Sequence, residues 1–259
     1  MMTRSHPNLA LSFTLAILLG LMNSRPAASH SADGGQPEAR NHTSHQASES
    51  PLPPPPATPP PAGQRTPGGG LSGENAGCPQ KSQALTALTP VNGQGATLSE
   101  QPTFWFYMPY TPEEIRRGEF SLLTQDETQR LYRTSFELPE TPGLVSIRWP
   151  DSTAFSLLEG QYYHWYVNLY CAANLTTQPD LKINGWVQRL AWTPEREYQV
   201  NTASAEIWYD AIARLAERLQ TTSPETTRLR QDWAELLELV ELSELTPAPL
   251  VGPVIPMDD

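Results

Sequence analysis

The chain is poor in the residues on which catalytic and metal sites most often depend. It has two cysteines among 259 residues, and His164 is the only histidine after His45. None of the motifs H-E-x-x-H, G-x-x-x-x-G-K-[ST], G-x-G-x-x-G and G-x-S-x-G occurs from residue 78 on, so the corresponding metalloprotease, nucleotide and hydrolase sites are not indicated. A Ser-His-Asp arrangement would have to use His164. We therefore predict no catalytic residue, no metal site and no cofactor.

The basic excess that is typical of nucleic-acid-binding proteins is also missing. The formal net charge is −11 at pH 7. The first 77 residues contain four acidic and four basic side chains, so the whole acidic excess lies after them. An acidic domain repels nucleic acid and anionic lipid, and we expect neither as a partner.

The N-terminal apolar run is too short for a comfortable membrane crossing, which needs about 20 residues. This run, Leu9 to Met22, follows Arg4 and precedes the small residues Ala27 and Ala28. That order is typical of a secretory signal. We expect a signal peptide over residues 1–28, export to the periplasm or cell surface, and no transmembrane span after cleavage. An uncleaved anchor is the alternative.

Residues 29–77 are rich in proline, glycine and serine, with the densest proline run at Pro51–Pro61. Such a segment cannot bury enough apolar surface to offset its ordering entropy, so we expect a disordered spacer with polyproline II character. A PxxP ligand for a groove-binding domain is the alternative. His42 and His45 could bind a metal ion only weakly, because no fold fixes their geometry.

The folded part is expected over residues 78–244, followed by a Pro-rich tail at 245–259. Cys78 and Cys171 are its only cysteines, and in an exported chain such a pair indicates one disulfide. Two free thiols or a metal-binding pair are the alternatives. A metal site would need further ligands that the sequence does not supply.

Short alternating runs predict a mainly β fold. Each run is rich in aromatic or β-branched residues and is bounded by proline or glycine. We predict a small antiparallel β-sandwich of the immunoglobulin type, with a turn at Asn184–Gly185. The runs are Pro102–Tyr110, Arg130–Pro139, Leu144–Pro150, Glu159–Cys171 and Ile183–Trp192.

Helical periodicity marks the C-terminal third. Ala205–Leu219 carries an apolar stripe, and a second stripe follows from Pro224 to Val240. These segments predict a helical hairpin packed on the sandwich. Thr111 also has the position of an N-cap for a short helix from Pro112 to Gly118.

Two of the predicted strands would present aromatic side chains on the face turned away from the sandwich core. The apolar stripe of the hairpin, with Trp208, Leu215 and Trp233, is expected to cover one of these faces. The alternative is an exposed platform that stacks on sugar rings or anchors a protein partner. The candidate residues are Trp105, Tyr107, Tyr162, His164, Tyr166 and Tyr170.

Five sequence blocks occur in order: LTALTP, PTFWFYMPY, PGLVSIRWP, GQYYHWYVNLYC and GWVQRL. Together they resemble the cyanobacterial "domain of unknown function 928" family, from about Cys78 to the second predicted helix. The resemblance implies an exported cyanobacterial envelope protein with no assigned activity and no assigned catalytic residues. The family's cysteines match Cys78 and Cys171, which agrees with the expected disulfide.

Two functions remain after these exclusions. The leading one is a non-catalytic protein-binding or adaptor module that contacts another envelope protein. The alternative is a glycan-binding or glycan-hydrolysing domain with an aromatic-lined surface. Hydrolysis would need two carboxylates across a cleft. The candidates Glu113, Glu114, Asp126 and Glu127 fall in expected loops and helix starts, where solvated charge is the ordinary interpretation.

Overall fold

The structure, a computed structural model, describes residues 58–68, 78–150, 155–172, 177–221 and 226–257. The expected signal peptide lies outside these residues. So does the expected spacer, except for residues 58–68.

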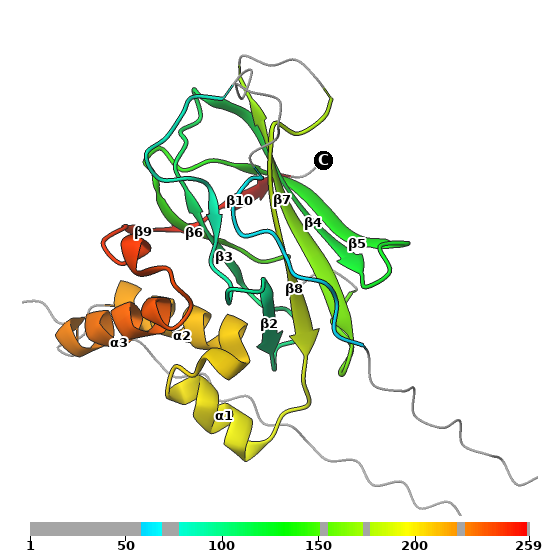
Figure 1. Ribbon diagram of the computed structural model, residues 1–259, viewed down its shortest axis with the longest axis vertical. Helices are drawn as coiled ribbons and strands as arrows, with labels where there is room; N and C mark the ends of the chain where they lie inside the picture. Colours follow the sequence, from blue (N-terminus) through cyan, green and yellow to red (C-terminus); the bar gives the residue numbers. More distant parts are fainter. Residues whose placement is uncertain (1–57, 69–77, 151–154, 173–176, 222–225, 258–259) are drawn as a thin grey trace, which may run out of the picture. The chain divides into compact units, whose positions relative to one another are not determined.

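Within the described residues, ten strands form two sheets (Figure 1). The mainly β fold with C-terminal helices is therefore confirmed. Most neighbouring strands are antiparallel, but β6 and β9 are parallel, as are β2 and β8, and the strand order is not that of immunoglobulin domains. The four-stranded sheet has the order β1 (Thr86–Ala87), β3 (Phe104–Met108), β6 (Gly143–Ile147), β9 (Leu250–Pro253). The six-stranded sheet has the order β10 (Ile255–Met257), β5 (Arg130–Glu137), β4 (Ile115–Thr124), β7 (Tyr162–Cys171), β8 (Leu181–Arg189), β2 (Gln94–Thr97).

The two sheets share an aromatic core. The ring of Phe104 in β3 lies 5.1 Å from that of Phe120 in β4 and 5.5 Å from that of Trp165 in β7, between centroids. Successive strand residues point to opposite faces, so every second residue of β7 should be buried. This pattern is confirmed, because Tyr163, Trp165, Val167, Leu169 and Cys171 are all buried.

The predicted helix from Pro112 to Gly118 is wrong. Residues 112–114 form a turn, and Ile115 already begins β4, which lies in the middle of the six-stranded sheet. A Cβ atom on Gly118 would lie 2.4 Å from the ring of Phe136. The glycine therefore permits close packing in the core and does not end a helix.

The predicted turn at Asn184–Gly185 is also wrong, because β8 continues through both residues. Gly185 lies opposite Trp165 in the strand pairing, and a Cβ atom there would meet the indole ring at 2.8 Å. A glycine inside a strand often marks such a close approach.

The predicted helical hairpin is present as α2 (Trp208–Gln220) and α3 (Thr226–Glu238), preceded by a short helix α1 (Pro194–Asn201). Val200 is the only buried residue of α1, so the sequence of this helix has no apolar stripe. Thr193 caps it by accepting the backbone N–H of Arg196. Two one-turn 3-10 helices are η1 (Ala205–Ile207) and η2 (Ser243–Leu245).

Helix α2 enters the core through the two aromatic residues at its start. Trp208 Nε1 donates to the carbonyl of Leu88 at 2.7 Å. The hydroxyl of Tyr209 accepts from Trp165 Nε1 at 2.7 Å and donates to the carbonyl of Trp186 at 3.0 Å. Figure 1 shows that the helices group at one end of the sheets, beside β2 and β3.

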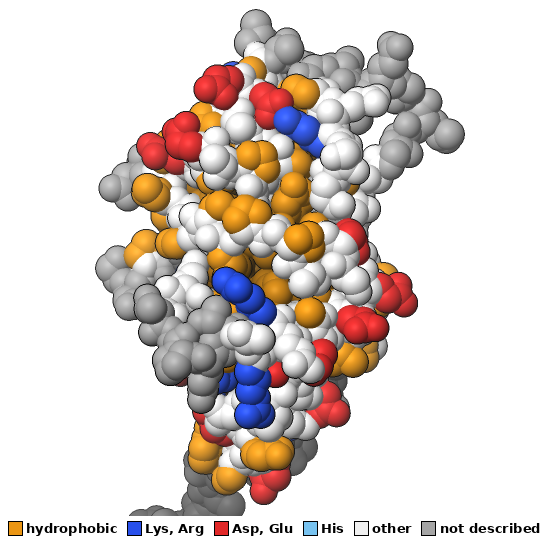
Figure 2. All heavy atoms as spheres, turned by 90° about the vertical axis from the view of Figure 1, so that its left-hand side faces the viewer, with side chains coloured by type: hydrophobic (Ala, Val, Ile, Leu, Met, Phe, Trp, Pro, Cys, Tyr) orange, Lys and Arg blue, Asp and Glu red, His pale blue; other side chains and the backbone are white. Residues whose placement is uncertain are grey.

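Segments on both sides of residues 78–244, the part that was expected to fold, also belong to the folded structure. Residues 58–68, which we call the N-terminal strap, form a bridge between Gln64 and Asn184 of β8. At the other end, the expected Pro-rich tail contributes β9 to one sheet and β10 to the other. On the face that carries α3 and β9, hydrophobic side chains reach the surface across the middle and acidic side chains lie around them (Figure 2).

Three glycines allow the strap to cross the sheet edge. A Cβ atom on Gly93, whose φ is +71°, would lie 2.6 Å from Gly63 Cα. One on Gly63 would lie 3.0 Å from Gly185 Cα. Backbone meets backbone at this crossing, so no side-chain rotation could relieve a clash.

The disulfide between Cys78 and Cys171 is present, with Cα atoms 5.2 Å apart. Asp180 lies beside it and accepts the backbone N–H of Cys171 at 2.9 Å. The two sulfur atoms and the Asp180 carboxylate are close enough for a metal ion, but cysteine binds metals as the free thiolate. The bond therefore uses up the ligands of this cluster.

Replacing Gly93 with alanine should detach the strap. Left-handed backbone costs a residue with a Cβ about 1–2 kcal/mol, and the clash with Gly63 adds to it. Gly160→Ala is the control, because φ is +76° and nothing lies within 4 Å of its added Cβ. Hydrogen exchange of residues 58–68 should accelerate at least tenfold in Gly93→Ala alone. Equal exchange in the two variants would contradict the crossing.

Removing the disulfide should lower the free energy of unfolding by about 4–5 kcal/mol, because the bond closes a loop of 93 residues. The comparison is between the wild-type chain and a variant with Cys78→Ser and Cys171→Ser together, by urea denaturation. A reducing agent should destabilise the wild type alone. A variant as stable as the oxidised wild type would refute the stabilising role.

Candidate functional site

Four of the six aromatic candidates lie on one surface, the outer face of the six-stranded sheet. Tyr162, His164, Tyr166 and Tyr170 alternate along β7 with the buried core residues, so they point away from the core. Among the described residues, α2 packs instead against β2 and β3.

The other two candidates, Trp105 and Tyr107, belong to the four-stranded sheet. They alternate with Phe104 and Phe106, which are in the core, so they face outward from β3. Trp105 is buried and lines a hollow beside α2, while Tyr107 is half-buried. The six predicted residues thus belong to two different sheets.

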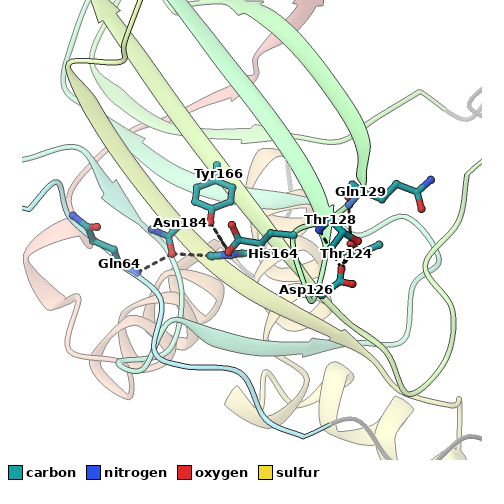
Figure 3. Close-up of polar contacts among 9 residues, drawn as sticks. Gln64, Thr124, Asp126, Thr128, Gln129, His164, Tyr166 and Asn184 are labelled. Carbon is teal, nitrogen blue, oxygen red and sulfur yellow. Dashed lines mark hydrogen bonds and ion pairs between the residues drawn. The ribbon is translucent and has the colours of Figure 1, made fainter.

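His164 lies at the centre of a hydrogen-bond network on the outer face of the six-stranded sheet. Its Nε2 lies 2.9 Å from Asn184 Oδ1, and its Nδ1 lies 2.7 Å from Glu127 Oε1 and 2.8 Å from the hydroxyl of Tyr166. Its ring stacks on Trp186 at 3.7 Å. Figure 3 shows His164 between Tyr166 and Asn184, with Gln64 of the strap beyond Asn184.

The contacts of Asn184 show that the Nε2 atom of His164 carries a proton. Asn184 Oδ1 also accepts the backbone N–H of Gln64 at 3.2 Å, so it is an acceptor and His164 Nε2 donates to it. Nδ1 lies within hydrogen-bond distance of both the Glu127 carboxylate and the Tyr166 hydroxyl, and that hydroxyl also donates to Glu127 at 3.0 Å.

Glu127 reaches this network from the turn between β4 and β5, where its φ is +57°. The same turn is held by Asp126, whose carboxylate accepts from the hydroxyls of Thr124 and Thr128 (Figure 3). Burial raises the pKa of Glu127, but hydrogen bonds from His164 and Tyr166 and the charge of Lys182 outweigh it and hold the pKa below the usual value. Burial and the Glu127 carboxylate raise the pKa of Tyr166.

Cationic side chains cover the tyrosine rings of β7. Lys182 Nζ lies 3.9 Å from the ring centroid of Tyr166, and the Arg117 guanidinium lies 4.1 Å from that of Tyr170. Both distances are within the range of a cation–π contact. The ring faces are therefore occupied by neighbours from the same chain.

Glu119 joins two of the arginines of this surface. It is 4 % exposed, and its Oε2 lies 2.5 Å from Arg133 and 3.8 Å from Arg117. Strand pairing places Ser121 opposite both Arg133 and Tyr166. We call this surface the polar face; it comprises Arg117, Glu119, Glu127, Arg133, His164, Tyr166, Lys182 and Asn184.

Several members of the polar face could not be identified from the sequence alone. Glu127 was interpretable only as solvated charge, and its carboxylate is indeed 47 % exposed, but it also pairs with a buried histidine. Glu119 directly follows the segment from Pro112 to Gly118 that has a helical signal, and its partner Arg133 on β5 is distant in sequence. Asn184 is followed by Gly185, and this pair is typical of a turn, so its position inside a strand was not predicted. The signal that remains is the alternation of β7, which places its even-numbered residues together.

Residues 61–250 match the sequence profile of the Domain of Unknown Function (DUF928) family. The chain belongs to the DUF928 family. The match begins inside the N-terminal strap, so residues 61–68 of the strap fall within the family's domain. No curated protein and no solved structure matches the chain. Among the described residues of this DUF928 protein, none of the helices has the length and apolar composition needed to cross a membrane.

Glu127→Gln should make the chain less stable at neutral pH but not at low pH. Since the folded-state pKa of Glu127 is lowered, its carboxylate stabilises the fold above the ordinary glutamate pKa of about 4.3, and this stabilisation is lost as the pH falls through the lower folded-state value. The difference from wild type should stay below about 1 kcal/mol, because the side chain is half-exposed.

Urea denaturation from pH 3 to pH 7 measures this difference. Glu140→Gln, at an exposed position outside the network, is the matched control and should show no such trend. A difference for Glu127→Gln that grows toward low pH would contradict the assigned contacts.

Proposed function

We propose that this DUF928 protein is an exported, non-catalytic binding module that recognises another protein of the cell envelope through its polar face. The observation that carries the proposal is that the side chains of this face hold one another in place. Arg133, Glu119 and Arg117 form one connected set, and Lys182, Tyr166, Glu127, His164 and Asn184 form another.

Such order lowers the cost of binding. A long side chain that is fixed only on association costs about 0.5–1.5 kcal/mol of conformational entropy. Arginine and tyrosine are also enriched among the residues that dominate protein interfaces. The guanidinium groups of Arg133 and Arg117, which the buried Glu119 holds, suit a partner with acidic groups, and such charge complementarity gives specificity and speeds encounter.

The same contacts favour a protein partner over a glycan on this face. Stacking on a sugar requires an open ring face, and Lys182 and Arg117 already cover Tyr166 and Tyr170. Both ring nitrogens of His164 have partners within the chain. The face therefore offers fixed charges and hydroxyls at its surface.

Export is supported by the order of charged, apolar and small residues at the N-terminus. A disulfide between Cys78 and Cys171 fits an oxidising compartment. These two features are independent of each other, and both favour the periplasm or cell surface as the place of binding.

Site-specific photocrosslinking in the intact cell envelope tests this function. A benzophenone amino acid replaces Tyr162, which is half-exposed at the start of β7 on the same side of the strand as His164 and Tyr166, or Tyr198, which is exposed on α1 and serves as the matched control. We expect a protein adduct of one discrete mass from position 162 and none of that mass from position 198. Adding Lys182→Glu should lower the adduct yield at least tenfold. Adducts that are the same from both positions, or insensitive to Lys182→Glu, would refute the proposal.

A further inference from the structure

A hollow of about 460 Å³ lies between β3 and α2, away from the polar face. Its first wall is the segment that leads into β3, with Gln101 and Thr103, and its floor includes Trp105. Its second wall is one side of α2. Small-molecule sites in proteins commonly measure about 300–1,000 Å³. The α2 residues in this wall are Asp210, Ala213, Arg214, Glu217 and Gln220, whose spacing places them on one helix face.

Trp105 lines the hollow with part of an apolar ring, and its buried indole nitrogen is a donor. Trp105 is 4 % exposed, and its indole N–H has no hydrogen-bond partner among the residues that the structure describes. A buried donor without a partner is rare in native proteins. On the opposite wall Ala213 is the smallest side chain of its helix face, and a larger residue there would occupy the hollow.

The charged groups of the walls balance each other. Arg148 and Arg214 line it together with Asp210 and Glu217, so the hollow presents charges of both signs. Asp210 is anchored by the backbone N–H of Leu98 at 3.0 Å, and burial raises its pKa. Arg214 is anchored by Glu197 at 2.9 Å.

Asp210 and Arg214 can still form further hydrogen bonds after these structural contacts. A guanidinium has five N–H donors and a carboxylate has about four acceptor positions, so each retains donors or acceptors after its structural contact. Gln101 and Gln220 add amide groups that donate and accept. A ligand that fits must therefore offer several donors and several acceptors at once and carry no net charge.

We propose that this hollow is a binding site for a neutral sugar ring. Each sugar hydroxyl both donates and accepts, which matches the mixed set of amides, carboxylates and guanidinium groups on the walls. The ring carbons provide apolar C–H groups for the indole of Trp105. This site belongs to a different sheet from the polar face and involves a different class of ligand, so it does not depend on the protein-binding function.

The test uses the full exported chain and four named sugars, glucose, galactose, mannose and N-acetylglucosamine, titrated by saturation-transfer NMR. We expect saturable binding of at least one of them to the wild type. Ala213→Leu should weaken that binding at least tenfold because the added carbons fill the hollow. Trp105→Phe should also weaken it, because the smaller ring removes part of the apolar surface that Trp105 contributes to the lining.

Ala234→Leu is the matched control, since Ala234 is equally half-exposed on α3 and does not line the hollow. It should bind the sugar as the wild type does. Saturable binding to none of the four sugars would overturn the proposal. So would binding that Ala213→Leu leaves unchanged. A variant that fails to fold is recognised by its near-UV circular dichroism, and the remaining variant then decides.

Discussion

The buried hydroxyl of Tyr209 connects the three parts of this structure on which the account depends. It accepts a hydrogen bond from Trp165 in the core and donates one to the backbone of Trp186 in β8. The hydroxyl thereby fixes the start of α2 against both β7 and β8. Since Tyr209 is 1 % exposed, losing either contact would leave a buried polar group without a partner, which typically costs about 1–3 kcal/mol.

The contacts of Tyr209 affect both the hollow beside α2 and the polar face. On one side, the position of α2 sets the width of the hollow that Trp105 and Ala213 both line. On the other, Trp186 presents its indole ring to His164 at 3.7 Å. Trp186 of β8 therefore links the core to the polar face. Its backbone carbonyl accepts the hydrogen bond from Tyr209, and its indole ring stacks on His164.

Local sequence signals predicted the elements whose pattern is set by burial alone. The alternation of β7 and the stripes of α2 and α3 identify their buried faces, since one face of each must be apolar. Gly118 and Gly185 misled the prediction because a glycine permits close packing as well as a turn, and the residue that packs on each, Phe136 or Trp165, is distant in sequence. α1 has almost no buried face and hence no pattern.

The candidate site was predictable only in part, for the same reason. The even-numbered residues of β7 share a face by strand geometry, so four of the six aromatic candidates were correctly grouped. Their partners come from the strap, β4, β5 and β8, and no local pattern encodes which of these strands are neighbours. On β7 the cations Lys182 and Arg117 cover rings of Tyr166 and Tyr170, whereas α2 lies beside Trp105 of β3.

The central claim is that the polar face is ordered before any partner binds, and side-chain ¹⁵N relaxation of the free protein measures this directly. The account predicts Nε order parameters for Arg117 and Arg133 that approach the value of rigid backbone, about 0.85, while that of the exposed Arg230 falls below about 0.6. If Arg117 and Arg133 were as mobile as Arg230, the face would be an ordinary solvated surface and the account would be wrong.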